Sequence, residues 1–313
     1  MSTLLLIGAG LLVRSYSGVQ RVDPGFDPAG VLTMTMTLPE DKYREPYQRR
    51  QFYSEAINRL ERLGGVRPAG FVNVLPFSTY DGGTQLTIDG APTPERGREP
   101  SASYRIASPR YHAAMRIPLV EGRFFDSRDS AEGQPVALIN QALARQYLNG
   151  RSAVGRRVGR GRAAHAPWLT IVGVIGDVHH SALTDDPDPE VYVPMAQAPA
   201  AMMMLVLRSG TRPEDLTGAV RAEIEAIDPA LPVYHVKTLE ALVGDSMLVR
   251  SASVAAMALF STLALILAAV GIYGVVAYGV SQQSREFSLR LALGATPRDL
   301  RRLVLGSGML MVG

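Results

Sequence analysis

The longest uninterrupted apolar stretch of the chain lies near its C-terminal end. No charged residue occurs between Arg250 and Arg285, and Val254–Val280 is almost wholly apolar. A bilayer core requires about 20 apolar residues in a helix, so this stretch can span it even when tilted. The pattern therefore predicts a transmembrane helix at residues 251–284.

Small residues recur along this predicted helix, and arginines follow it. Small side chains let a neighbouring helix approach closely, and the expected packing positions are Ala264, Ala268, Gly271 and Gly274. Glycine is also common in membrane helices without any packing role, so both interpretations stay open. Five arginines against two acidic residues follow the span, and the positive-inside rule therefore places this end in the cytoplasm. The arginines are Arg285, Arg290, Arg298, Arg301 and Arg302.

Both ends of the chain are apolar as well. Thr3–Val13 and Leu303–Gly313 each have about half the length that a membrane span needs. We expect residues 1–16 and 303–313 to be parts of truncated transmembrane helices, and the chain to be a fragment of a longer protein.

Residues 17–250 have the patterns of a mixed α+β domain outside the membrane. Apolar residues and threonines alternate in one segment, which predicts a half-buried strand; its apolar face consists of Leu32, Met34, Met36 and Leu38. A helical stripe follows, made of Phe52, Ala56, Leu60 and Leu63. Gly64 and Gly65 end this helix, and Gly70–Leu75 is expected to form the next strand.

The same order of elements recurs later in the chain. Met202–Leu207 is a buried type of strand, and Thr211 with Glu214 predicts a capping box at the start of a helix. The apolar stripe of that helix is Leu216, Val220, Ile224 and Ile227. Pro232–Val236 then predicts a closing strand. Two such β-α-β units can share one sheet in a ferredoxin-like arrangement.

A segment of different character, residues 80–199, separates the two units. It is rich in Gly, Pro and Arg, and short strands are expected at Leu86–Ile88, Pro135–Ile139 and Leu169–Ile175. Asn140 is the expected N-cap of a short helix, Gln141–Leu148. The fold class is therefore an α+β extracytoplasmic domain, in which residues 28–79 and 200–240 form one part and 80–199 an inserted mixed subdomain, flanked by transmembrane α-helices.

Composition excludes several classes of function. The net charge of +3 is too small for a nucleic-acid surface, and the absence of cysteine excludes disulfides and thiolate chemistry. The histidines that could bind a metal, His165, His179 and His180, lack suitable partners, because neighbours on a strand point to opposite faces. Val154–Arg162 lacks the features of a phosphate-binding loop and is expected to be a basic hairpin. We therefore expect no catalytic centre, no metal and no cofactor.

The segment after the apolar run is basic and amphipathic. Phe287 and Leu291 lie four residues apart, while Arg285, Glu286 and Arg290 supply polar faces. Gly294 ends this short helix, and Thr296 with Pro297 starts the next one. The pattern is typical of a helix that docks in a partner's groove. An ordinary basic loop obeying the positive-inside rule is the alternative.

This segment resembles the coupling-helix region of the MacB/FtsX-type ABC transporter permeases, whose motif has the form R-E-x-x-x-R-x-A-x-G-A. The matching residues are Arg285, Glu286, Arg290, Ala292, Gly294 and Ala295. Phe287 departs from the family, in which Ile often follows the Glu. Upstream, RVDPGFDPAGVLTMTMTLP and TIVGVIGDVHHSALTDDPDPEVYVPMAQ resemble the periplasmic core domain of the same permeases, especially the duplicated-permease subgroup.

The resemblance implies a permease subunit of the bacterial inner membrane without its own catalysis. A separate ABC ATPase subunit would bind the cytoplasmic face at residues 285–302 and drive a porter part of the periplasmic domain, for efflux or export. The coupling residues would be Arg285, Glu286, Phe287, Arg290, Leu291, Ala292, Gly294 and Ala295. The further partners implied are a second permease copy or repeat, a periplasmic protein and membrane lipids, with no nucleic acid.

Two other functions remain open from the residues alone. A transmembrane sensor would carry a ligand-binding domain outside and signal to a kinase through a continuing heptad coil, which Gly294 and Pro297 would interrupt. An FtsX-like regulator would act on periplasmic enzymes without transport. A membrane-anchored hydrolase lacks any nucleophile or metal constellation.

Overall fold

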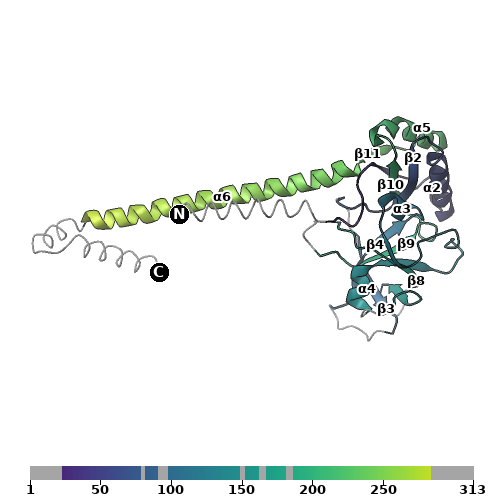
Figure 1. Ribbon diagram of the computed structural model, residues 1–313, viewed down its shortest axis with the longest axis horizontal. Coiled ribbons are helices and arrows are strands. Elements are labelled where there is room, and N and C mark those ends of the chain that lie inside the picture. Colours follow the sequence, from purple (N-terminus) through teal and green to yellow (C-terminus); the bar gives the residue numbers. More distant parts are fainter. Residues whose placement is uncertain are drawn as a thin grey trace, which may run out of the picture. The chain divides into compact units, whose positions relative to one another are not determined.

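The computed structural model describes residues 23–78, 82–90, 98–148, 152–161, 167–180 and 186–282, with the side chains of α6 described only in part (Figure 1). The chain divides into two compact units, Met1–Ser246 and Met247–Gly313. Every described strand belongs to the first unit. The long helix α6 (Leu239–Gln282) begins in the first unit and makes up the described part of the second.

The first unit alternates strands with short helices. In chain order its elements are β1 (Val31–Thr37), α2 (Pro46–Leu60), β2 (Val66–Val72), β3 (Gly83–Ile88), β4 (Ser101–Ala107), α3 (Tyr111–Met115), β5 (Leu119–Gly122), β6 (Val136–Asn140), α4 (Gln141–Tyr147), β7 (Arg157–Arg160), β8 (Trp168–Ile175), β9 (Glu190–Pro194), β10 (Met202–Ser209), the 3₁₀ turn η1 (Pro213–Leu216), α5 (Thr217–Ile227) and β11 (Val233–Thr238).

Strands from the two ends of the first unit form one antiparallel layer in the order β11-β1-β10-β2. Each of its two β-α-β units places its helix on the same face, where α2 and α5 contact one another (Figure 1). The core between this face and the helices includes Met34, Met36, Phe52 and Ile224. The strand and helix stripes expected from the sequence therefore meet in one core.

The strand β1 is buried on both faces, so the expectation of a half-buried strand is wrong. Thr33 and Thr35 are only 3% and 5% exposed. The second face of the layer is covered by α3 and by the first turns of α6, which form another core with Val31 and Val206. The Thr33 hydroxyl donates to the Lys237 carbonyl at 2.9 Å, and this hydrogen bond allows the polar side chain to be buried.

The ends of the helices were predicted less well than their apolar faces. In α2 the expected residues Phe52, Ala56 and Leu60 are buried. The capping box expected from Thr211 and Glu214 is wrong, because η1 starts after Arg212 with no side-chain cap. The Thr211 amide instead donates to the Ser209 hydroxyl at 3.0 Å, which forms a local turn.

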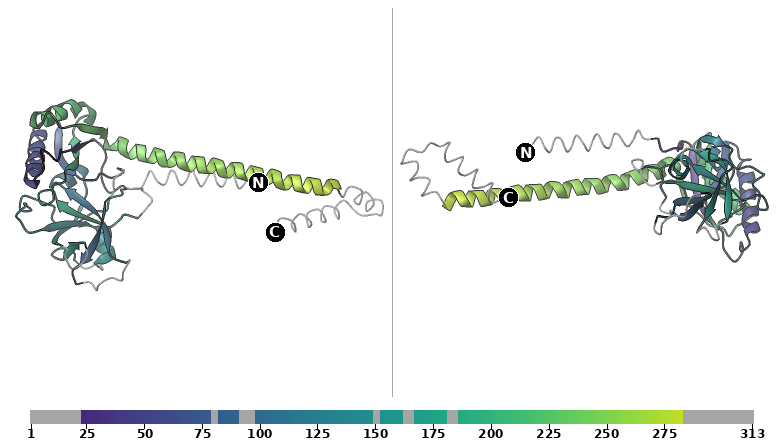
Figure 2. Two further views of the ribbon diagram at one scale, coloured as in Figure 1. Left: turned by 180° about the vertical axis from the view of Figure 1, so that it is seen from behind. Right: turned by 90° about the horizontal axis from the view of Figure 1, so that it is seen from below.

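The strands between β2 and β10 close into a ring. Their pairings run β4-β3-β7-β8-β6-β9, and β9 returns to pair with β4 in parallel, so these six strands enclose a separate core. Figure 2 shows this ring and α4 beside the four-stranded layer. The Asn140 cap of α4 is confirmed, since its side chain accepts from the Leu143 amide. Of the basic hairpin expected at Val154–Arg162, the described residues form a turn and the strand β7, which pairs antiparallel with β8; the second arm therefore lies beyond the expected bounds.

The helix α6 starts at Leu239, earlier than the expected boundary at Ser251, and has 44 residues. Large apolar side chains are exposed along its described part, among them Leu263, Leu267 and Val270. Within the residues that the structure describes, no helix combines the length and apolar character that crossing a membrane requires.

Candidate functional site

The junction between β11 and α6 joins the first unit to the long helix. The Ala241 amide donates to the Thr238 hydroxyl at 3.2 Å, a hydrogen bond typical of a helix N-cap. Leu239 is fully buried against the core under α3. Lys237 Nζ also lies 2.7 Å from Asp245 Oδ2, linking the end of the strand to the second turn of the helix.

The start of β1 lies next to this junction. Leu32 pairs with Thr238, so the segment that leads into β1 and the helix that leaves β11 lie at the same end of the sheet. Displacing one of them therefore acts on neighbouring strands of the layer.

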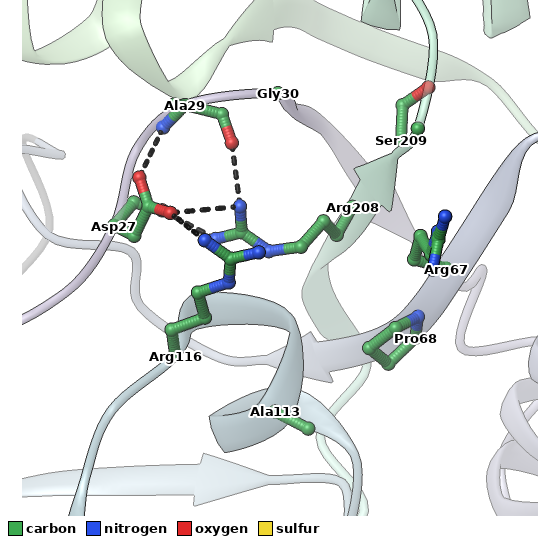
Figure 3. Close-up of a pocket in the computed structure, with 10 residues that line it drawn as sticks. Asp27, Ala29, Gly30, Arg67, Pro68, Ala113, Arg116, Arg208 and Ser209 are labelled. Carbon is green, nitrogen blue, oxygen red and sulfur yellow. Dashed lines mark hydrogen bonds and ion pairs between the residues drawn. The ribbon is translucent and has the colours of Figure 1, made fainter.

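A basic pocket of about 570 Å³ lies at this end of the sheet. Three arginines and one carboxylate line it together with small residues. The lining residues are Asp27, Ala29, Gly30, Arg67, Pro68, Ala113, Arg116, Arg208, Ser209 and Gly210. Figure 3 shows Arg116 and Arg208 meeting at Asp27, with Arg67 beside Pro68.

Arg208 is a structural member of this pocket. Its guanidinium donates to the carbonyls of Ala114, Ala29 and Asp27 at 2.7, 2.6 and 2.6 Å, and to Asp27 Oδ2 at 3.3 Å. Burial lowers the pKa of Arg208, and the Asp27 carboxylate opposes this effect. These bonds use most of the donors of Arg208. Through them, Arg208 in β10 links the segment before β1 to α3.

Arg116 and Arg67 keep donors available. Arg116 ends α3 in a left-handed conformation, with φ of 56°, and donates to Asp27 Oδ2 at 2.6 Å through one nitrogen. Arg67 is exposed on β2, and its guanidinium makes no hydrogen bond or ion pair within the described part of the chain. The pocket therefore has more positive than negative charge.

A second polar cluster, almost wholly buried, surrounds the carboxylate of Glu190 in the ring. Arg105 Nε and His180 Nε2 each lie 2.9 Å from Glu190 Oε1, and the Tyr192 hydroxyl donates to Glu190 Oε2 at 2.8 Å. Burial opposes ionisation of Glu190, but His180, Arg105 and Tyr192 together hold its pKa below the usual range. Burial raises the pKa of Tyr192.

His112 lies close to this cluster but has no polar partner of its own. Both of its ring nitrogens lack a hydrogen bond among the described residues, as does the hydroxyl of Tyr111. The imidazole is fully buried and stacks on Phe124, with ring centroids 5.1 Å apart. Burial lowers the pKa of His112 to about 3, so the ring is neutral at physiological pH.

The residues singled out from the sequence are not brought together in one site. The coupling residues Arg285–Ala295 and His165 lie outside the described residues. Ala264, Ala268, Gly271 and Gly274 are all exposed on α6. Among the described residues no group of His, Cys, Asp and Glu could hold a metal ion.

Sequence reasoning missed both polar clusters. One signal was present: Arg105, Glu190 and Arg208 each stand within or directly beside an apolar strand. A charged residue in such a position is seldom buried without a partner. That signal identifies a buried charge but does not name its partner, because Arg105 and Glu190 are far apart in the chain.

Comparison with known proteins defines the class. Residues 11–223, more than half of the chain, match the family described as MacB-like periplasmic core domain, and residues 258–312 match the FtsX-like permease C-terminal family. The chain therefore belongs to the MacB-like periplasmic core domain family and is a fragment of a MacB/FtsX-type ABC transporter permease. The resemblance inferred from the sequence is confirmed.

Curated relatives match most of the chain. The macrolide export ATP-binding/permease protein MacB of Rhodospirillum rubrum is 25% identical over 293 residues, covering 87% of this chain and 44% of the relative. The pyoverdine export ATP-binding/permease protein PvdT of Pseudomonas putida is 24% identical over 209 residues, covering 62% and 30%. The chain thus spans less than half the length of these relatives.

Solved structures are similar at lower levels. The periplasmic region of MacB from Actinobacillus actinomycetemcomitans has a TM-score of 0.48 at 9% identity, covering 71% of this chain and 94% of that one. The extracellular domain of the ABC-type transporter YknZ has a TM-score of 0.41 at 14% identity, covering 65% and 100%.

Proposed function

We propose that this chain is the permease part of an export ABC transporter of the MacB type, and that it passes motion from an ATPase to its extracytoplasmic domain. The observation that carries the proposal is the junction of β11 with α6. There, Thr238 caps the helix and Leu239 anchors its first turn in the core. Motion of α6 would therefore act directly on the four-stranded layer.

The two β-α-β units give that layer a ferredoxin-like arrangement in this proposal. Its order β11-β1-β10-β2 places the first strand of each unit in the centre and the second strand at an edge. Such a layer, backed by α2 and α5, would act as the porter part. The six-stranded ring would be the inserted subdomain.

No helix qualifies as a membrane span among the described residues, but several side chains of α6 lie outside them. From the whole sequence of α6 we propose that this helix spans the inner membrane. Its sequence from Val254 to Val280 carries no charged residue, and Leu259, Phe260 and Ile266 expose their side chains. Exposed apolar side chains in such a run favour lipid or another membrane helix as their surroundings. Ala264, Ala268, Gly271 and Gly274 would then let a second span approach.

The ATPase would dock at the coupling segment that follows α6. Phe287 and Leu291 would fill its groove, and Arg285, Glu286 and Arg290 would form ion pairs around them. The relatives named above are called ATP-binding/permease proteins, so ATP hydrolysis is assigned to another domain or subunit. Export is proposed because the same names describe exporters.

The test uses the full chain together with its cognate ATPase in lipid nanodiscs. Because the chain has no cysteine, a spin label attached through Glu214→Cys, an exposed position in the turn η1 before α5, reports the distance between two copies. ATP is expected to change this distance. A flexible seven-residue Gly/Ser insert after Asp245 should abolish the change, whereas a seven-residue Ala/Glu/Lys helical insert, which returns to nearly the same helix face, should preserve it.

Two results would contradict the proposal. One is a label distance that ATP does not alter in the unmodified chain. The other is an equal response with the flexible and the helical insert, which would show that a continuous α6 is not needed. Docking is tested separately: Leu291→Asp and Glu286→Lys should each weaken capture of the ATPase, and Ser288→Ala should leave capture unchanged.

A further inference from the structure

The basic pocket at the end of the sheet has a surplus of charge. Arg67, Arg116 and Arg208 contribute three positive charges and Asp27 one negative charge, which leaves a net charge of +2. A pocket of about 570 Å³ falls within the range of small-molecule sites. Its charge therefore matches one dianionic group.

The donors that face this pocket differ in availability. Arg208 is held by four hydrogen bonds to Asp27, Ala29 and Ala114, so it supplies mainly positive potential. Arg116 uses only Nη1 for Asp27. Arg67 has no hydrogen bond or ion pair within the described ranges. Arg67 and Arg116 thus each keep N–H donors on two neighbouring nitrogens available. This arrangement suits the geometry of two phosphate oxygens.

The walls of the pocket leave room beside these donors. Ala29, Gly30, Pro68 and Ala113 are small, and Gly210 lies under Arg67, with a Cβ at that glycine 3.4 Å from Arg67 Nε. Figure 3 shows Arg67 and Arg208 on opposite sides of the end of β10, where Ser209 lies. The small residues in the pocket wall leave space for an apolar group attached to the anion.

We propose that this pocket binds a phosphomonoester, held by Arg67 and Arg116 in the positive potential of Arg208. Two sources share this chemistry: a small soluble phosphate compound, and a phosphatidic-acid type of lipid headgroup. The inference rests on the pocket alone and does not depend on transport or on an ATPase.

The test measures binding of two probes, glycerol 3-phosphate and short-chain phosphatidic acid, to the full chain in detergent. Saturable binding of at least one probe is expected, with acetate and short-chain phosphatidylcholine far weaker. Arg67→Gln should weaken binding about tenfold, the size expected for loss of one charge-assisted hydrogen bond. Arg67→Lys should retain part of the affinity, because it keeps the charge but not the fork.

Arg62→Gln is the matched control, because Arg62 is also exposed and lies outside the pocket. It removes the same charge and should leave binding unchanged. Equal unfolding temperatures of the ligand-free variants show that Arg67→Gln leaves the fold intact. Similar affinity for both probes identifies a soluble ligand, and much tighter phosphatidic acid identifies a lipid. Failure of both probes to saturate, or equal binding by Arg67→Gln and Arg62→Gln, would overturn the proposal.

Discussion

Arg105 Nε and Glu190 Oε1 lie 2.9 Å apart, and both side chains are only 1% exposed. Arg105 is in β4 and Glu190 begins β9, the two strands whose parallel pairing closes the six-stranded ring. The pair therefore lies where the ring closes. His180 and Tyr192 complete the surroundings of the carboxylate, which removes much of the cost of burying it.

Replacing Glu190 by Gln should destabilise the protein strongly. Glu190→Gln removes the carboxylate charge that pairs with the buried Arg105 guanidinium, and breaking a buried pair in this way typically costs about 3–5 kcal/mol. The double variant Arg105→Met/Glu190→Leu should recover most of this loss, because it leaves no charge behind. Denaturant unfolding monitored by fluorescence of the single tryptophan, Trp168, measures both free energies.

Glu225→Gln is the control for this prediction. Glu225 is exposed on α5, and exposed substitutions usually change stability by less than about 0.5 kcal/mol. If Glu190→Gln were no more destabilising than Glu225→Gln, the buried pair would have no structural role.

His112 should make stability fall as the pH falls. Its folded pKa of about 3 lies below the unfolded value of about 6.5. Between these values the unfolded state binds more protons, so stability declines by about 1.4 kcal/mol per pH unit on acidification. His112→Phe keeps a ring against Phe124 and should remove that slope, whereas His235→Gln, at an exposed position, should not. Unfolding curves from pH 4 to 7 test this, and parallel slopes for His112→Phe and the unmodified chain would contradict it.

Gly70 should not tolerate a side chain. A Cβ at Gly70 would lie 2.6 Å from the amide nitrogen and 2.7 Å from the Cα of Tyr111, so α3 would have to move away from β2. Overpacking of this kind typically costs about 1–3 kcal/mol. Gly64→Ala is the matched control, since nothing lies within 4 Å of its Cβ position. Equal denaturation midpoints for the two alanine variants would show that α3 does not need the close approach.

The sequence could predict elements whose apolar positions repeat locally. The stripes of α2 and α5, the alternation in β1 and the Asn140 cap depend on neighbours within a few residues, and each leaves a periodic signal. Burial of Thr33 could not be predicted in this way. It depends on the Lys237 carbonyl, 204 residues away in the chain.

The two polar clusters show the same limit. The Asp27 and Arg208 pairing joins the segment before β1 to the end of β10, and Arg105 meets Glu190 only because the ring closes. A single sequence shows that Arg208 follows an apolar strand but not which carbonyls surround it. Which distant side chains meet depends on how the strands are ordered in the sheet. The local periodicity of apolar residues does not reveal that order.

Leu267→Arg should disrupt membrane insertion of α6 if the helix spans the bilayer. Leu267 is 64% exposed and lies at the centre of the apolar run from Val254 to Val280, where an arginine costs about 2.5–3.5 kcal/mol on insertion scales. A glycosylation-reporter assay on the full chain should therefore show a clear loss of the spanning form. Leu267→Ile keeps the apolar character and should insert normally. Ser246→Arg, outside the apolar run, should also be tolerated, because an arginine there can keep its charge in water or in the polar interface. Undiminished insertion of Leu267→Arg would mean that residues 254–280 do not cross the membrane, and the assignment of α6 as the link between an ATPase and the domain would fall with it.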